Sequence, residues 1–322
     1  MFNKISIRTL AAVFVVLLAI VLIGIFSGNQ KKSRSFKSDL AVFDTAQVSQ
    51  IIVYPKSGGE LITFKKRGNN WQVSEAGETC NADNDQVRNM LITVSELKAK
   101  RLAGKGKEYW DKYEVTDSLG TRVKLSGGKK ALADVYVGKF SYTQPPQSAN
   151  PYQRQQGTMT SFVRLNNDKD VYAVDGYLAI MFNRKIKDYR DSKVLKVPKN
   201  SIEQITINQP DGVITIVKND SVWMVDGLMA DSTAMEDYLS ELSFVRSTDF
   251  LPEAMKPMGS ATHQLRLEGG NGILLGEVDA FFVDSTNIAI AGSINEGTWF
   301  DGTKAELFTR LFKPKASLLE AE

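Results

Sequence analysis

The sequence predicts an α+β protein: two tandem repeats whose mainly antiparallel sheets are covered by helices, preceded by one N-terminal transmembrane helix. Three observations predict it, namely an uncharged run near the N-terminus, segments of alternating apolar and polar residues, and the recurrence of one series of segments later in the chain. The chain has 322 residues, 43% of them hydrophobic and 24% charged. This composition excludes disorder and a multi-span transporter, and the length allows two domains.

Residues 10–26 form the uncharged run, which as a helix would extend about 26 Å and just cross a bilayer. A cleavable signal peptide is the alternative interpretation, because the basic residues Lys4 and Arg8 precede the run. Cleavage requires small residues near the exit, where this chain has Ile25 and Phe26. We therefore expect an uncleaved, single-pass anchor.

Basic residues flank this run on both sides, and those after it outnumber those before it. The later group consists of Lys31, Lys32, Arg34 and Lys37. By the positive-inside rule this charge would keep the C-terminal domains in the cytoplasm, but long domains translocate largely regardless of charge. We expect them to lie outside the inner (cytoplasmic) membrane, in the periplasm.

The expected organisation has two repeat domains between shorter connecting segments. The predicted parts are a tail at 1–9, the anchor at 10–26, a juxtamembrane linker at 27–46, the first repeat domain at 47–192 with a polar insertion at 141–161, a linker at 193–200, the second repeat domain at 201–315 and a tail at 316–322.

Each repeat opens with three β-rich segments. Residues 48–53, 61–65 and 71–73 are matched in the second repeat by 202–207, 213–217 and 223–225. The segments alternate in the manner of strands, and Gly, Asn and Asp between the second and third predict hairpins.

A helix follows in each repeat, at an offset of 148 residues without a gap. Asp83 and Asp231 stand where an N-cap belongs, because their carboxylates can accept hydrogen bonds from the free amides of a first turn. Apolar residues then recur at helical spacing. They are Val87, Met90, Leu91, Val94 and Leu97 in the first repeat and Met235, Tyr238, Leu239 and Leu242 in the second.

Further strands and a short helix complete each repeat, so that the unit is β-β-β-α-β-β-β-β-α. The strands are predicted at 121–125, 134–137, 161–165 and 171–174, and at 263–267, 276–282, 288–291 and 298–300; the closing helices are predicted at 177–182 and 304–312.

No combination of residues predicts catalysis, a cofactor or a metal site. The chain has one cysteine and one histidine, too few for a disulfide framework or a multi-histidine site. Cys80 corresponds to Leu228 in the other repeat, which favours a small buried side chain over an activated thiol. We interpret His263 as structural. Trp71 and its counterpart Trp223 could stack on sugar rings, but their recurrence favours core anchors.

Residues 141–161 have no counterpart in the second repeat and are rich in Gln, Pro, Ser and Tyr. A long segment without apolar periodicity is typical of a functional loop or of a plain surface insertion, and both alternatives stay open. The candidate partner-contact residues are Tyr142, Gln144, Pro145, Pro146, Tyr152 and Arg154.

The chain resembles domain-of-unknown-function family 4340 in a set of strand motifs. They are Tyr113-Glu-Val, Thr121-Arg-Val-Lys-Leu125, Val137-Gly138, Ser161-Phe-Val-Arg-Leu165 and Val171-Tyr-Ala-Val-Asp175. The resemblance covers the first repeat fully and the second more weakly, and it departs at Tyr113-Glu-Val, where Tyr-Gly-Leu is usual. It implies a bacterial protein with one N-terminal span, similar to Bacteroidetes members found beside ABC-type export permeases and gliding-motility-type components. It implies no catalytic residues.

We therefore expect a non-enzymatic, membrane-anchored accessory protein that binds another envelope protein, such as an ABC-type transporter assembly. The net charge of +3 is spread without a basic block, so no nucleic-acid partner is expected. One alternative is a module that binds a glycan or lipid in a cleft between the repeats. The other is a glycoside hydrolase that uses carboxylates alone.

Overall fold

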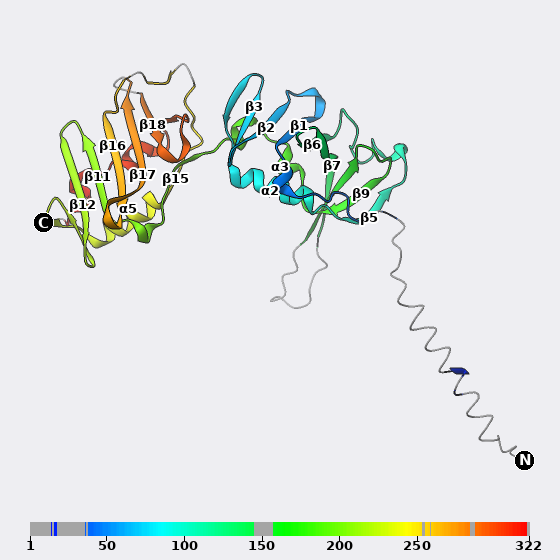
Figure 1. Cartoon of the computed structure of the whole chain (residues 1–322), viewed down its shortest axis with the longest axis horizontal. Coiled ribbons are helices and arrows are strands. Elements are labelled where there is room, and N and C mark those ends of the chain that lie inside the picture. Colours follow the sequence, from blue (N-terminus) through cyan, green and yellow to red (C-terminus); the bar gives the residue numbers. More distant parts are fainter. Residues whose placement is uncertain are drawn as a thin grey trace, which may run out of the picture.

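The structure is a computed structural model and describes residues 14, 16, 17, 36, 38–144, 157–252, 255–257, 259–283 and 287–320. Figure 1 shows two lobes joined at a narrow connection, each with a sheet and helices along one side of it. The fold is mixed α and β, with mostly antiparallel sheets and few helices. This confirms the predicted class in its broad form. The predicted order β-β-β-α-β-β-β-β-α is wrong, because each half of the chain has one more short strand before its 12-residue helix and one more directly after it.

The first domain contains a nine-stranded sheet. In spatial order its strands are β4 (Glu78–Asn81), β3 (Asn70–Glu75), β2 (Ile62–Arg67), β1 (Gln50–Tyr54), β6 (Thr121–Gly127), β7 (Lys130–Thr143), β8 (Thr158–Leu165), β9 (Val171–Asp175) and β5 (Ala99–Gly104). Strand β1 is central because it pairs with both β2 and β6, and its residues Ile51 and Val53 are fully buried.

The second domain contains an eight-stranded sheet and a separate two-stranded one. The larger sheet has the order β14 (Leu228–Met229), β13 (Val222–Val225), β12 (Gly212–Asn219), β11 (Gln204–Gln209), β16 (His263–Gly269), β17 (Ile273–Phe282), β18 (Ile288–Gly292) and β19 (Phe300–Asp301). The smaller sheet pairs β10 (Lys193–Lys196) with β15 (Phe244–Arg246).

Helices α2 and α5 form where the capping residues and the apolar spacing predict them. Helix α2 spans Asn84–Ser95 and α5 spans Ser232–Ser243. Asp83 accepts hydrogen bonds from the amides of Asp85 and Gln86, and Asp231 accepts one from Ala234. The predicted apolar residues of both helices are buried. The shorter helices are α3 (Ala179–Phe182), α4 (Ile186–Tyr189) and α6 (Leu307–Leu311).

Each domain has its own hydrophobic core. The first core contains buried residues from Leu40 to Tyr189, and the second contains buried residues from Val194 to Leu318. A smaller cluster around Tyr113 and Phe162 lies at the far end of the first domain. The boundary between the domains therefore falls between Tyr189 and Val194.

Three segments predicted as connections or tails are folded. Strand β10 occupies half of the predicted linker 193–200, and its Val194 and Leu195 are almost completely buried. The end of the predicted juxtamembrane linker packs on the first domain, where the Leu40 amide donates to the carbonyl of Leu97. In the predicted tail 316–322, Leu318 is buried in the second core. The prediction failed because these segments are too short to show a periodic pattern.

The predicted insertion 141–161 is shorter than expected, because strands occupy both of its ends. Strand β7 continues to Thr143 and β8 begins at Thr158, with Tyr142 paired to Met159. Apolar and polar residues alternate only weakly at these two strand ends, so the sequence did not indicate that the strands extend this far.

Most of the predicted anchor at 10–26 lies outside the described residues. Within the part of the chain that is described, no helix is long and apolar enough to cross a membrane.

Leu195→Ala should lower the free energy of unfolding by about 2–5 kcal/mol, because it leaves a cavity in a buried strand. Urea unfolding followed by circular dichroism would measure it. Lys196→Ala is the matched control, since the Lys196 side chain is exposed on the same strand. Equal, small effects of both changes would mean that this segment behaves as a linker.

Candidate functional site

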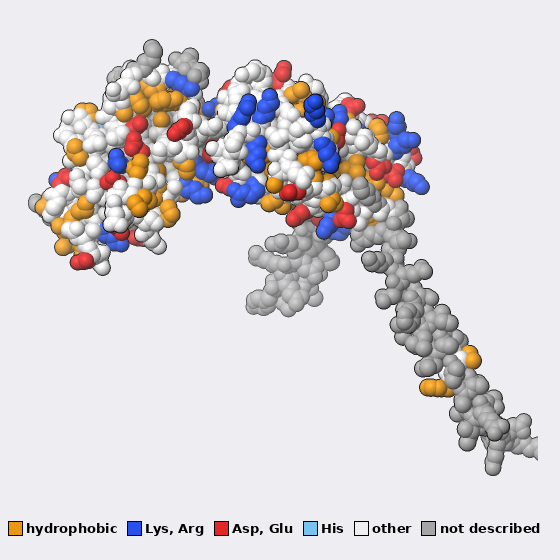
Figure 2. All heavy atoms as spheres, in the orientation of Figure 1, with side chains coloured by type: hydrophobic (Ala, Val, Ile, Leu, Met, Phe, Trp, Pro, Cys, Tyr) orange, Lys and Arg blue, Asp and Glu red, His pale blue; other side chains and the backbone are white. Residues whose placement is uncertain are grey.

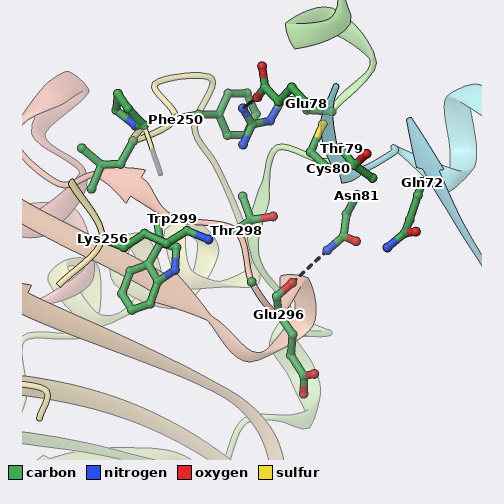
Figure 3. A pocket seen from close by; sticks show the side chains of 14 residues that line it. Gln72, Glu78, Thr79, Cys80, Asn81, Phe250, Lys256, Glu296, Thr298 and Trp299 are labelled. Atoms are coloured by element: carbon green, nitrogen blue, oxygen red, sulfur yellow. Dashed lines mark hydrogen bonds and ion pairs between the residues drawn. The ribbon is translucent and has the colours of Figure 1, made fainter. Parts of the chain in front are cut away.

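A cleft of about 660 Å³ lies between the two domains. One wall is the edge of the first sheet, including Thr79 and Cys80 of β4, and the other includes Phe250, Thr298 and Trp299. Figure 3 shows these groups on opposite sides of the opening. Figure 2 shows that the molecular surface narrows where the two domains meet.

Asparagine side chains hold the two domains together beside the cleft. The Asn81 side-chain amide donates to Asn295 Oδ1 at 3.0 Å and to the Glu296 carbonyl at 2.9 Å, the latter drawn in Figure 3. Asn295 is 2% exposed and donates in turn to the carbonyl of Asp191 at 2.7 Å. Thr298 completes the group by donating to Asn295 Oδ1. These contacts are hydrogen bonds, so their geometry restricts how the two domains approach each other.

A buried ionic group lies at the point where the chain passes from the first domain to the second. Lys193 Nζ is 3.2 Å from Asp83 Oδ1 and 3.1 Å from Asp191 Oδ1. Arg246 of β15 approaches the other Asp83 oxygen at 3.7 Å. Asp83 also caps α2, so one carboxylate ties the first helix to two basic groups of the second domain.

The ionic group shifts the pKa values of its members. Burial opposes ionisation of Asp83, but Lys193 and the amides of Gln86 and Asp85 outweigh burial and lower the pKa of this carboxyl. Burial likewise disfavours the charged form of Lys193, and the carboxylates of Asp191 and Asp83 outweigh it and raise the pKa of the ammonium. Both groups are therefore charged at neutral pH.

Arg190 closes the end of the cleft nearest the domain junction. Its guanidinium lies 4.0 Å from the centre of the Phe250 ring and pairs with Glu78 at 3.1 Å. Its Nε atom is buried and has no hydrogen-bond partner among the described residues. The stack positions Phe250 against the first domain, although Phe250 belongs to the second.

Cys80 is half-buried in the wall of the cleft, where it packs against the first core. Burial raises the pKa of its thiol to about 11, with Arg190 opposing part of the rise. A thiol nucleophile needs a lowered pKa, so this environment does not activate Cys80. Its counterpart Leu228 is 54% exposed, so the correspondence between the two positions does not reflect shared burial.

The predicted candidate residues lie away from the cleft or outside the described part of the chain. Tyr142 is 53% exposed near the end of β7, and Gln144 is exposed just after it. The remaining candidates lie outside the described residues; they are Pro145, Pro146, Tyr152 and Arg154.

The other residues singled out in the sequence pack against hydrophobic or aromatic side chains. Trp71 is buried in the first core, whereas Trp223 is half-buried against the second. The His263 ring stacks on Phe282 with 5.1 Å between centroids and meets Phe308 edge to face. Burial lowers the pKa of His263, with Asp211 opposing it.

Sequence reasoning did not find the cleft residues. Asn81 and Asn295 are 214 positions apart, and Arg190 and Phe250 belong to segments without a periodic pattern. The tandem arrangement predicts a cleft between the repeats but does not indicate which edges form it. Among the described residues, no group of three His, Cys, Asp or Glu could hold a metal ion.

The fold and the cleft define a protein with two antiparallel-sheet domains that meet through a polar contact. The chain belongs to the domain of unknown function family DUF4340, whose sequence model matches residues 71–265. The match begins in β3 and ends in β16, so it includes the cleft-lining strand β4 and the segment 189–193 where the chain passes between the domains, but not Asn295, Thr298 or Trp299. Searches of curated proteins and of solved structures found no match.

Asp83→Asn should lower the free energy of unfolding at pH 7 by about 1–3 kcal/mol, because the amide still caps α2 but loses the charge that faces Lys193. The extra stability of the wild type over Asp83→Asn is fully present above the pKa of an unfolded Asp, about 4. It is lost as the pH falls through the lowered pKa of Asp83 in the folded protein. Denaturation between pH 2 and pH 7 would measure it.

The matched control is Asp85→Asn in the same turn, whose carboxylate is half-exposed, pairs with Arg88 at 2.6 Å and lies farther from Lys193 than Asp83 does, at 3.9 Å. It should change stability by about 0–1 kcal/mol. An Asp83→Asn effect that persisted unchanged to pH 2 would contradict the assigned role of this charge.

Proposed function

We propose that this protein is a non-enzymatic, membrane-anchored accessory protein that binds another protein of the bacterial envelope, such as an ABC-type export or gliding-motility-type assembly. In this proposal residues 10–26 hold it in the inner membrane, and the two domains lie in the periplasm. The proposal draws on the uncharged N-terminal run and on the exposed apolar surface described next.

We further propose that the two domains are copies of one ancestral unit. The strand orders β4-β3-β2-β1-β6-β7-β8-β9 and β14-β13-β12-β11-β16-β17-β18-β19 follow the same path, and each 12-residue helix follows its edge strand. A duplicated binding scaffold explains this correspondence without requiring a catalytic centre in either copy.

The observation that carries the binding role is an exposed apolar surface on the hairpin of β7 and β8. This hairpin surface consists of Phe140, Tyr142 and Met159, which are 43%, 53% and 42% exposed. Phe140 stacks on Tyr177, and Ile180 of the adjacent helix α3 is 57% exposed. The hairpin projects from the first domain (Figure 1). Contiguous exposed apolar side chains of this kind are typical of protein contacts.

The test is to crosslink tagged full-length protein in its native membrane and to identify what is purified with it. The double change Tyr142→Ser and Met159→Ser should reduce recovery of permease or ATPase subunits about tenfold, because exposed aromatic anchors dominate such contacts. Replacing residues 144–157 by a two-residue Asn-Gly turn, which can keep the Thr143–Thr158 pair, should also reduce recovery, with little change in melting temperature.

Val213→Ser is the matched control, since Val213 is 58% exposed on a strand of the other domain. It should leave recovery unchanged. Equal recovery from all variants would refute the hairpin surface as the contact.

The proposed orientation is tested separately by fusing alkaline phosphatase, which is active only outside the cytoplasm, to the C-terminus. We expect an active fusion, because the N-terminal run should export the long domain that follows it. An inactive fusion, with an active cytoplasmic reporter at the same position, would place the domains in the cytoplasm.

The cleft between the domains supports a second candidate function, in which the protein is a module that binds a ligand. Its volume lies within the usual range of ligand sites, about 300–1,000 Å³. The chemistry of its walls bears on the kind of ligand that it would hold.

A further inference from the structure

Strand β4 is an edge strand, and it faces the cleft. It pairs with β3 on one side, with Cys80 opposite Val73 and Asn81 opposite Gln72. Thr79 and Cys80 line the opening. An edge strand of this kind presents backbone donors and acceptors that a further strand could use.

The direction of these backbone groups follows from the hydrogen bonds at the end of β4. The carbonyl of Asn81 accepts from the Asp191 amide at 2.8 Å, and the Asp83 amide donates to the carbonyl of Tyr189. Both groups point away from β3, whereas the Ala82 amide points toward it and donates to Trp71. Because alternate residues of a strand direct their backbone groups to opposite sides, Thr79 directs its N–H and C=O away from β3, toward the cleft.

The chain itself begins a tenth strand on this edge and then leaves it. Residues 189–191 pair antiparallel with the edge, with Arg190 opposite Ala82. After Asp191 the chain turns into the second domain, where Lys193 starts β10. Residues 189–191 therefore pair with only one end of this edge. The rest of the edge, from Glu78 to Cys80, faces the open cleft.

The opposite wall supplies side-chain contacts. Phe250, Pro252 and Trp299 of the second domain line the cleft, while Glu78 and Glu296 add exposed carboxylates at its margin. A strand edge that faces a wall with aromatic side chains is an arrangement in which proteins bind extended peptides by adding them to the sheet.

We infer that the cleft binds an extended polypeptide segment, which adds to the edge of β4 as an antiparallel strand in line with residues 189–191. Its backbone pairs with the N–H and C=O of Thr79, and its side chains on one face lie against Trp299 and the part of Phe250 that Arg190 leaves uncovered. This inference names the ligand class for the cleft and does not depend on the hairpin surface or on membrane anchoring.

The walls fit a glycan or a lipid less well. Sugar rings stack on open aromatic faces, but Phe250 is covered by Arg190 at 4.0 Å and packs on Phe300 at 5.4 Å between centroids. A lipid chain requires a continuous apolar lining, whereas charged side chains such as Glu78, Arg190 and Glu296 line this cleft.

The test is selection of a phage-displayed library of random linear 12-residue peptides on the intact protein, followed by fluorescence anisotropy with the enriched peptides. Thr79→Pro should weaken binding about tenfold or more, because it removes the outward N–H and obstructs the edge. The variant should fold, since Pro is tolerated where a strand's N–H does not join the ladder. Thr79→Val is the matched control and should bind as the wild type does.

Hydrogen exchange of the wild-type protein gives a second readout that does not depend on a variant. The amide of Thr79 should gain protection when an enriched peptide is added. The inference is overturned if no peptide is enriched, if enriched peptides bind Thr79→Pro as tightly as the wild type, or if protection maps elsewhere. A thermal shift with a glycan panel or with phosphatidylglycerol vesicles, and none with peptides, would also overturn it in favour of those ligands.

Discussion

The carboxylate of Asp83 is the group on which the arrangement of the two domains depends. It caps α2 in the first domain and meets Lys193 and Arg246 of the second. A buried carboxylate is costly unless it is paired, so the second domain must supply its basic groups at this point. The approach of the domains, and with it the width of the cleft, follows from satisfying that charge.

The junction leaves the edge of β4 open for a related reason. To bring Lys193 to Asp83, the chain must leave β4 immediately after Asp191, which ends the pairing that residues 189–191 had begun. Asn295 then satisfies the carbonyl of Asp191 from the second domain. The same turn that closes the ionic group therefore creates a strand edge with unused backbone groups beside a second wall.

Much of the fold could be predicted from the sequence, because long periodic segments carry their own signal. The caps at Asp83 and Asp231 and the buried faces of the two helices are where the pattern places them. Short elements escaped prediction. Strand β10 has four residues, too few to show a period, and only its pairing with β15 and its burial in the second core distinguish it from a linker. The cleft escaped for another reason, since its walls come from residues such as Asn81 and Phe250 that no sequence pattern singles out.

The sequence by itself determined the local structure of this protein. Alternation sets which faces of the strands are buried, and helical spacing with a capping Asp sets where α2 and α5 begin. Only the tertiary structure decided which edges meet, because the Asn81–Asn295 contact joins residues 214 positions apart. No local pattern encodes such a contact. It arises because buried polar groups must find partners, and the partners within reach are known only once both domains have folded.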